Sequence, residues 1–303
     1  MRATFLAPTV LASLLLATVS LPAAAGSPAP RTIPGFEAPE SVLIAGERRF
    51  VSNIGVALDP TARDGDGFIS ELAPDGHVVA ARAFPRDGST LDAPKGMAMA
   101  GGRLYVADID RVVGFDASTG GRVFEARLPT TGPTLANDLA AVDDGHLLVS
   151  DTLGGSVWSL DLATGSFTRL TGAVPGANGI LYDPRTRSAL VVGLGADFGG
   201  GDIFRVGLDG STERVQASPH GIFDGIARLP DGAVVVSDWI ALAPPTPGRF
   251  LRHAPDGSGP GAPFDPGVAI TGPADFSVDA DGAVWSPATP ENAVVIATPP
   301  DQR

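Results

Sequence analysis

Residues 136–165 read ANDLAAVDDGHLLVSDTLGGSVWSLDLATG, and they predict two consecutive β-hairpins. Asp144-Gly145 precedes the β-prone stretch Leu147–Asp151, and Thr164-Gly165 follows a further strand, Ser156–Asp161. Glycine reaches positive φ at little steric cost, so both pairs can close tight turns between antiparallel strands. With one more strand after Thr164-Gly165, the stretch predicts a four-stranded antiparallel unit.

The same order of strands and turns recurs along the chain, at spacings of 41 to 55 residues. Four antiparallel strands repeated at this period describe a propeller blade, and no amphipathic helix of useful length interrupts the pattern. The sequence therefore predicts an all-β, six-bladed β-propeller of four-stranded antiparallel blades. The six starts are Pro39-Glu40-Ser41-Val42, Pro94-Lys95-Gly96-Met97, Ala136-Asn137-Asp138-Leu139, Ala177-Asn178-Gly179-Ile180, Phe223-Asp224-Gly225-Ile226 and Ala274-Asp275-Phe276-Ser277.

The sixth unit, Ala274–Ala297, has room for only three strands. Arg31–Phe36 precedes the first blade and has no place in it, so we expect this segment to supply the missing outer strand. Such closure leaves no blade with an exposed edge and ties the ring shut. The predicted propeller spans residues 31–303, after a linker at residues 26–30.

The first 25 residues predict a secretory signal peptide. Arg2 supplies the positive charge, Val10–Val19 the apolar segment, and Ala23-Ala24-Ala25 a small-residue cleavage site, so cleavage is expected near Ala25. No later stretch reaches the apolar length that a membrane span needs. We expect a periplasmic or secreted protein, and because the chain has no cysteine it has no disulfides to stabilise it after export.

The charge balance of the chain argues against one class of binding partner. The chain has 21 basic against 34 acidic residues and a formal net charge of −13, which disfavours nucleic acid. We expect a monomer that acts on a small molecule.

The second residue of each start is polar, whereas the residue two positions further on is apolar in five of the six units. First strands line the axis of a propeller, so these polar residues should converge at one height and form a collar at one mouth of the channel. Acceptor oxygens buried together are costly unless a cation or a hydrogen-bond network satisfies them, and calcium prefers such hard oxygen ligands. The collar residues are Glu40, Lys95, Asn137, Asn178, Asp224 and Asp275.

The order of Glu40, Asn137, Asn178 and Asp224 resembles the senescence marker protein/gluconolactonase (regucalcin) family, with paraoxonase and diisopropyl fluorophosphatase as more distant relatives. The phrases Asn178-Gly179-Ile180 and Asp224-Gly225-Ile226 and the strand Val236-Ser237-Asp238 add to this resemblance. It implies one divalent cation, most simply calcium, bound by Glu40, Asn178 and Asp224. Asn137 would be a fourth ligand or a substrate-binding group, and Asp224 would also position or deprotonate the attacking water.

Other interpretations of the collar stay open. Its polar residues could form a metal-free hydrogen-bonded network. Lys95 could neutralise Glu40 or Asp275 in place of a metal, or its ammonium could reach a bound substrate. With Asn137 and Asp275, Lys95 therefore completes the expected substrate-binding set.

Residues outside the collar offer weaker signals. Asp108, Asp151 and Asp238, with Asn53, end second strands on the collar's side, where they could form Asx turns or support the ligands. His220, four residues before Asp224, could be an ordinary loop histidine or a catalytic acid or base. His77, His146 and His253 lie beside hairpin turns and are expected to be solvated. The insertions Asp59–Gly67, Gly193–Gly201 and Ile240–Gly248 should rise around the collar.

Two functions follow from these expectations. The first is an exported, divalent-metal-dependent hydrolase of a lactone or small ester, with Asp224 and His220 as catalytic residues. The alternative is a non-catalytic exported propeller that binds a small ligand or a protein on its rim.

Overall fold

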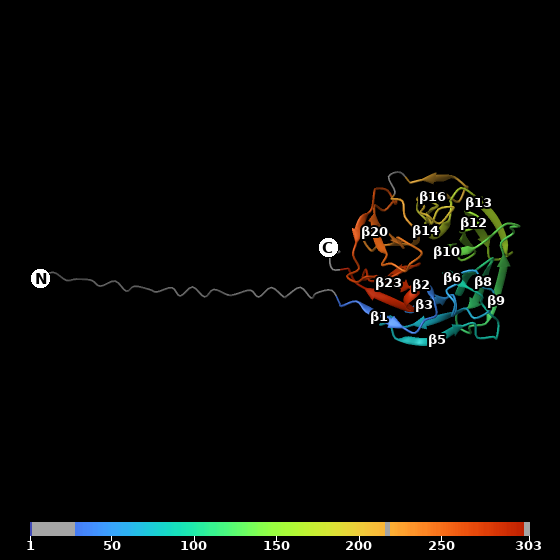
Figure 1. The fold of residues 1–303 in the computed structure, drawn as a ribbon, viewed down its shortest axis with the longest axis horizontal. Coiled ribbons are helices and arrows are strands. Elements are labelled where there is room, and N and C mark those ends of the chain that lie inside the picture. Colours follow the sequence, from blue (N-terminus) through green and yellow to red (C-terminus); the bar gives the residue numbers. More distant parts are fainter. Residues whose placement is uncertain (2–27, 216–218, 300–303) are drawn as a thin grey trace.

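The computed structural model describes Met1, residues 28–215 and residues 219–299. Within these ranges the chain forms six separate four-stranded antiparallel sheets, so the predicted six-bladed β-propeller is confirmed. The sheets stand around one axis in the order of the sequence (Figure 1). The predicted signal peptide and its cleavage site lie outside the described residues, except for Met1.

The first three blades follow one another without interruption. Blade one contains β2 (Pro39–Ala45), β3 (Arg48–Asn53), β4 (Phe68–Leu72) and β5 (Val78–Phe84). Blade two contains β6 (Pro94–Ala100), β7 (Arg103–Asp108), β8 (Arg111–Asp116) and β9 (Arg122–Arg127). Blade three contains β10 (Ala136–Asp143), β11 (His146–Asp151), β12 (Ser156–Asp161) and β13 (Ser166–Thr171).

Blade four contains β14 (Ala177–Asp183), β15 (Ser188–Gly193), β16 (Ile203–Gly207) and β17 (Thr212–Arg214). Blade five contains β18 (Phe223–Arg228), β19 (Val234–Asp238), β20 (Arg249–His253) and β21 (Ala262–Phe264). Blade six contains β22 (Ser277–Val278), β23 (Val284–Ala288) and β24 (Ala293–Ala297), with the 3-10 turn η1 (Thr289–Glu291) between the last two.

The N-terminal strand closes the ring as the sequence predicts. β1 (Arg31–Pro34) pairs antiparallel with β24 as the outermost strand of blade six, with Thr32 opposite Val295. Figure 1 shows β1 beside the C-terminal blade. Phe36 extends the contact, since its N–H donates to the carbonyl of Asn292 and its ring is buried.

Apolar clusters lie between successive blades and hold them together. Between blades one and two, Phe84 packs its ring against Phe50 and Phe115 at centroid distances of 5.7 and 5.6 Å. Between blade six and blade one, Trp285 and Val294 pack with Val42, so the closing interface has a core of its own. Each fully buried side chain of this size contributes roughly 1.5–3 kcal/mol.

The connections after second strands lie on one face of the propeller. Four of these connections are loop one (residues 54–67), loop three (152–155), loop four (194–202) and loop five (239–248). Loops one, four and five contain the predicted insertions, except for Gly193, which ends β15. First strands begin on this same face, because they run antiparallel to second strands.

Candidate functional site

A local irregularity in the first strands positions the collar residues. In blades three, four and five the ladder skips two residues, between Ala136 and Leu139 in blade three for example. A bulge of this kind bends the strand and redirects a side chain, here at the second residue of the start. Blade six differs, because Asp275 pairs with β2 of blade one: its N–H donates to Glu40 and its carbonyl accepts from Val42.

Serines of the second strands satisfy the displaced backbone. The hydroxyl oxygens of Ser52, Ser150 and Ser237 accept the N–H of the third start residue in blades one, three and five, at 2.8–3.0 Å. Without these hydroxyls each bulge would leave a buried donor unpaired.

The collar is buried, and its predicted ligands have oxygens without partners. Glu40, Asn137, Asn178 and Asp224 are each at most 7% exposed. Four of the five buried side-chain oxygens that lack a hydrogen bond in the described residues belong to them, namely Glu40 Oε2, Asn137 Oδ1, Asn178 Oδ1 and Asp224 Oδ1. Burying such atoms unpaired costs free energy, and a cation ligated by hard oxygens would remove that cost. The donor set therefore fits calcium.

The donor set is a mixed one. Within the described ranges, no three carboxylate, imidazole or thiolate groups gather in a metal-binding arrangement. A cation in the collar would be bound by two carboxylates and two carboxamides. Calcium accepts both carboxylate and carboxamide oxygens as ligands.

Four buried acidic groups in the channel have raised pKa values. Burial, then repulsion by Asp275, raises the pKa of Asp224 to about 7. Burial also raises the pKa of Asp275 to about 7, and it holds the pKa values of Glu40 and Asp138 well above their usual range. Deprotonating these groups would bring negative charges together in a buried site, at a cost that a cation would offset.

Lys95 anchors loop one. Its side chain is buried, and its ammonium donates to the carbonyls of Pro60 at 2.8 Å and Ala93 at 2.7 Å. Burial lowers the pKa of Lys95 to about 8, although Glu40 opposes this shift. In the described part of the chain no carboxylate lies within ion-pair distance of the ammonium. A substrate contact for Lys95 stays a prediction.

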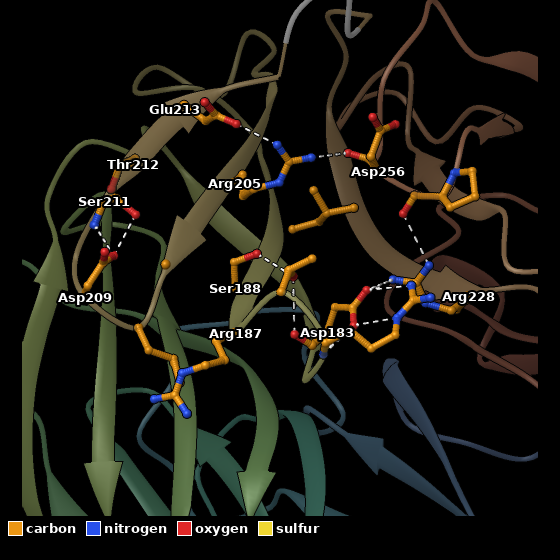
Figure 2. A pocket seen from close by; sticks show the side chains of 16 residues that line it. Asp183, Arg187, Ser188, Arg205, Asp209, Ser211, Thr212, Glu213, Arg228 and Asp256 are labelled. Atoms are coloured by element: carbon orange, nitrogen blue, oxygen red, sulfur yellow. Dashed lines mark hydrogen bonds and ion pairs between the residues drawn. The ribbon is translucent and has the colours of Figure 1, made fainter.

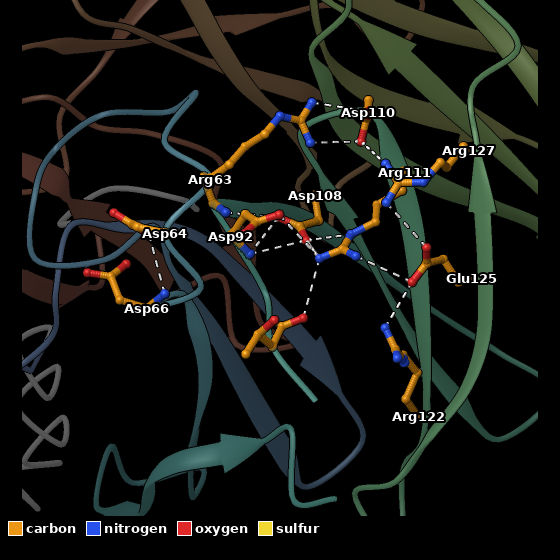
Figure 3. A network of polar contacts seen from close by, with 12 residues as sticks. Arg63, Asp64, Asp66, Asp92, Asp108, Asp110, Arg111, Arg122, Glu125 and Arg127 are labelled. Atoms are coloured by element: carbon orange, nitrogen blue, oxygen red, sulfur yellow. Dashed lines mark hydrogen bonds and ion pairs between the residues drawn. The ribbon is translucent and has the colours of Figure 1, made fainter. Parts of the chain in front are cut away.

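A network beside blade two fixes the same loop (Figure 3). Arg63 of loop one pairs with Asp110 at 3.1 Å, and Arg111 pairs with the buried Asp108 at 2.7 Å. Loop one is therefore attached to the collar through Lys95 and to blade two through Arg63.

Trp239 was not predicted from the sequence. It begins loop five, is half-buried, and its indole Nε1–H donates to Asp224 Oδ2 at 2.7 Å. This bond occupies one carboxylate oxygen and leaves Oδ1 for a cation. A tryptophan directly after the end of a second strand was a signal in the sequence, but nothing there indicated its partner.

Asp138, next to Asn137, was also not predicted. Its two carboxylate oxygens accept the backbone N–H groups of Leu139 and of Ile180 in the next blade, each at 2.7 Å. The hydroxyl of Ser41 donates to Asp275 in a similar bond between blades six and one. The carboxylates of Asp138 and Asp275 both line a cavity of about 430 Å³ in the channel. The apolar walls of this cavity include Met97, Leu139 and Ile226, as the alternation of the first strands predicts.

The polar residues that end second strands bind the segment that leads into the first strand of the same blade. The side chains of Asn53, Asp108, Asp151 and Asp238 each accept an N–H from the residue 16 positions earlier, two or three residues before the collar residue. Asp238 also accepts the N–H of Ile240, as an Asx turn does. The same contact thus fixes the backbone before four first strands. Support of metal ligands by these residues stays a prediction.

His220 lies on the rim and not in the collar. Its ring is 64% exposed, and Nδ1 lies 3.6 Å from Asp202 Oδ1 at the end of loop four. Nε2 faces the backbone of Gly200, where a Cβ would come within 2.6 Å of it. A catalytic role for His220 stays a prediction.

The expectation for His253 was wrong. This residue ends β20, is 3% exposed, and has neither ring nitrogen hydrogen-bonded. Gly261, after the turn, lies against the ring, where a Cβ would be 2.9 Å from Nε2. The adjacent hairpin covers the imidazole, and burial lowers its pKa.

A larger cavity, of about 920 Å³, lies between blades four and five (Figure 2). Its walls come from turns that follow first and third strands, so it opens on the face opposite the collar. Three of its four arginines pair with carboxylates: Asp183 pairs with Arg185 at 3.0 Å and with Arg228 at 3.6 Å, and Glu213 pairs with Arg205 at 2.6 Å. The collar, with its unpartnered oxygens, is the stronger candidate site.

No protein-family model and no curated protein matches this sequence. Among solved structures the chain is similar to virginiamycin B lyase from Staphylococcus aureus, with a TM-score of 0.58 at 12% identity over 89% of this chain and 99% of that chain. It is also similar to a streptogramin B lyase structure, with a TM-score of 0.57 at 13% identity over 88% and 96% of the two chains.

A regucalcin from Agrobacterium tumefaciens, described as a calcium-binding protein, is matched at a TM-score of 0.46 and 19% identity over 64% of this chain and 66% of that chain. At such low identity, the similarity to the two lyase structures shows a shared propeller fold and carries no information on chemistry. The weaker match to regucalcin adds nothing to this, so the resemblance to the gluconolactonase family rests on the collar residues themselves.

Proposed function

We propose that this chain is an exported, divalent-cation-dependent hydrolase that opens a lactone or cleaves a small ester, in the manner of the gluconolactonase family. The observation that carries the proposal is the buried set of four unpartnered oxygens on Glu40, Asn137, Asn178 and Asp224. Two of the four ligands are carboxylates, whose charge matches that of a divalent cation. Calcium is the cation that this donor set suits best.

The chemistry follows from this arrangement. When bound, a divalent cation polarises a carbonyl oxygen and stabilises the negative charge that develops on it. Trp239 donates to Asp224 Oδ2, and Oδ1 is buried without a partner and free to ligate the cation. The carboxamide of Asn137 can ligate through its oxygen and donate an N–H toward substrate.

The bond changes of the reaction are those of ester hydrolysis. The oxygen of a water forms a bond to the carbonyl carbon, the ring C–O bond breaks, and the proton lost by the water ends on the released alkoxide. The product is a hydroxy acid. Asp224 positions the water, and His220, exposed on the rim, is the second candidate to accept and return the proton.

Calcium binding can be tested without an assay of activity. Calcium should raise the melting temperature of the mature protein by mass action, and Asp224→Ala should abolish the rise. Asp281→Ala is the matched control, because Asp281 is an exposed carboxylate in the turn between β22 and β23. If calcium has no effect on the parent, the metal-free network is the correct interpretation of the collar.

Activity needs a second experiment. A panel of sugar lactones, aliphatic lactones and aryl esters should be assayed with calcium, with chelator, and with Asp224→Ala, Asn178→Ala and His220→Ala. Hydrolysis that is lost with chelator and with the first two substitutions supports the proposal. If calcium binds but no substrate turns over, the alternative of a non-catalytic binding propeller replaces it.

A further inference from the structure

Large apolar side chains are exposed on the loops around the collar. We call these residues the apolar rim: Val56 and Leu58 in loop one, Leu153 in loop three, and Ile240 and Leu242 in loop five, which are 78%, 50%, 42%, 49% and 46% exposed. Single exposed apolar residues are common on protein surfaces. Only their clustering on one part of the surface indicates a binding site.

That distribution is one-sided. Of the seven exposed large apolar side chains in residues 28–215 and 219–299, five belong to the apolar rim. The other two, Val79 and Val123, lie on the outer strands β5 and β9. In the described residues, no turn of the face opposite the collar exposes a large apolar side chain.

The loops of the apolar rim are fastened to the collar by hydrogen bonds. In loop one, the carbonyl of Pro60 accepts from Lys95. In loop three, the hydroxyl of Thr152, next to Leu153, donates at 2.7 Å to the carbonyl of Ala177, which directly precedes the collar residue Asn178. In loop five, Trp239 donates to Asp224. The apolar side chains therefore lie one to four residues from groups that touch the collar or its neighbours.

Ile240 of loop five combines an exposed side chain with a strained backbone. Its φ is 64°, a left-handed conformation that is unfavourable for a β-branched residue, and its side chain is about half exposed. Glycine or asparagine would relieve this strain. Strained residues gather at functional sites, and Ile240 is adjacent to the residue that bonds Asp224.

The charges of these loops select against an anionic ligand. Loops three and five contain no charged residue. Loop one carries Asp59, Asp64 and Asp66, and its arginine is paired with Asp110. A carboxylate or phosphate on the substrate would meet repulsion here, and the hydroxyls of a sugar would meet apolar surface without partners.

We propose that the collar accepts an uncharged lactone or ester with an aliphatic chain, and that this chain lies across Leu153, Ile240 and Leu242. This inference rests on the proposed function, because it assumes that the ester carbonyl is hydrolysed at the collar. Binding of the ligand's aliphatic chain can still be measured without turnover. Aliphatic carbons placed on the apolar rim leave water, which contributes affinity for each methylene buried.

The experiment uses γ-lactams with side chains of two, six and ten carbons, since a lactam keeps the ring carbonyl and resists hydrolysis. Their affinity for the calcium-loaded mature protein should be measured by titration calorimetry. We expect the dissociation constant to fall with chain length, by up to about fourfold for each methylene. The double variant Leu153→Ser, Ile240→Ser should lose this dependence, and Leu242→Ser alone should weaken it.

Val79→Ser with Val123→Ser is the matched control, because it removes equally exposed apolar side chains that are remote from the collar. Affinity that ignores chain length, or a loss of dependence in the control as well, overturns the inference. Chain-dependent binding without hydrolysis of the corresponding lactones leaves the apolar site standing and removes the hydrolase. Hydrolysis that prefers sugar lactones, with no effect of chain length, supports the hydrolase and removes the apolar site.

Discussion

The two oxygens of Asp224 have different surroundings. Oδ2 accepts from the indole of Trp239, whereas Oδ1 is buried without a partner. A carboxylate held at one oxygen has its orientation fixed, and a fixed ligand loses less freedom when it binds a cation. Trp239 is therefore a positioning residue for Asp224.

Trp239→Phe tests this role. The substitution keeps a ring beside Gly272 but removes the donor, so we expect calcium to bind 10–100-fold more weakly. Calorimetric titration with calcium measures the change. Trp158→Phe is the control, because Trp158 also donates its indole N–H, to Ser156 at 3.0 Å, but in the wall of blade three. Equal calcium affinity in parent and Trp239→Phe would show that the bond does not position the ligand.

At the scale of elements, the first strands approach one another closely at the collar. The third start residue is glycine in three blades, at Gly96, Gly179 and Gly225. A Cβ at Gly179 would lie 2.4 Å from the carbonyl oxygen of Asp224, and one at Gly225 would lie 2.8 Å from the Cα of Asp275. The absent side chain, and not an unusual φ, is what the strand needs here.

Gly179→Ala should therefore destabilise the protein. The added methyl group has to displace the backbone of blade five, at a cost of about 1–3 kcal/mol. Urea unfolding should show a lower midpoint with an unchanged slope. Gly132→Ala provides the comparison, since a Cβ at Gly132 has no atom within 4 Å. Equal midpoints for the two variants would mean that the first strands can separate freely.

β1 is the element that closes the ring, through four paired residues with β24 and through the buried ring of Phe36. A chain that begins at Glu37 should melt roughly 10 °C below one that begins at Arg31, because it loses a large aromatic side chain from the last interface. The exposed edge of β24 should also promote association. Calorimetry with light scattering measures both effects, and identical melting of the two chains would contradict closure by β1.

At the scale of the whole molecule, the acidic groups of the channel link stability to pH. Raised pKa values for Glu40, Asp138, Asp224 and Asp275 mean that, without a cation, the folded chain holds more protons than the unfolded chain. The free energy of unfolding then falls as pH rises from the ordinary carboxyl range to about 7, the folded pKa of Asp224 and Asp275, and these two groups add no further loss above it.

We expect the melting temperature in chelator to be lower at pH 8 than at pH 5, and calcium to reverse this order, because the cation binds deprotonated ligands. Surface carboxylates such as Asp87 and Asp116, whose hydrogen bonds lower their pKa to about 2, act only in more acidic solution. Melting curves at both pH values, with and without calcium, check the prediction. Asp224→Asn should flatten the dependence in chelator, and a parent that is more stable at pH 8 in chelator would refute it.

The sequence by itself determined the propeller and the order of its collar. Aspartate-glycine turns and alternating strands act over a few residues, so the six starts at Pro39, Pro94, Ala136, Ala177, Phe223 and Ala274 could be aligned without a structure. Because every blade repeats one geometry, aligned starts also placed Glu40, Asn137, Asn178 and Asp224 at one height, and the missing strand of the last blade indicated Arg31–Phe36.

Only the tertiary structure decided what those residues touch. Trp239 reaches Asp224 from 15 residues away, Lys95 donates to Pro60 across 35 residues, and His253 is covered by the hairpin that follows it. These contacts depend on how loops of irregular length pack over the rim, and no periodic pattern encodes that packing. The same holds for the apolar rim, whose five exposed side chains come from loops of three separate blades on one face of the ring.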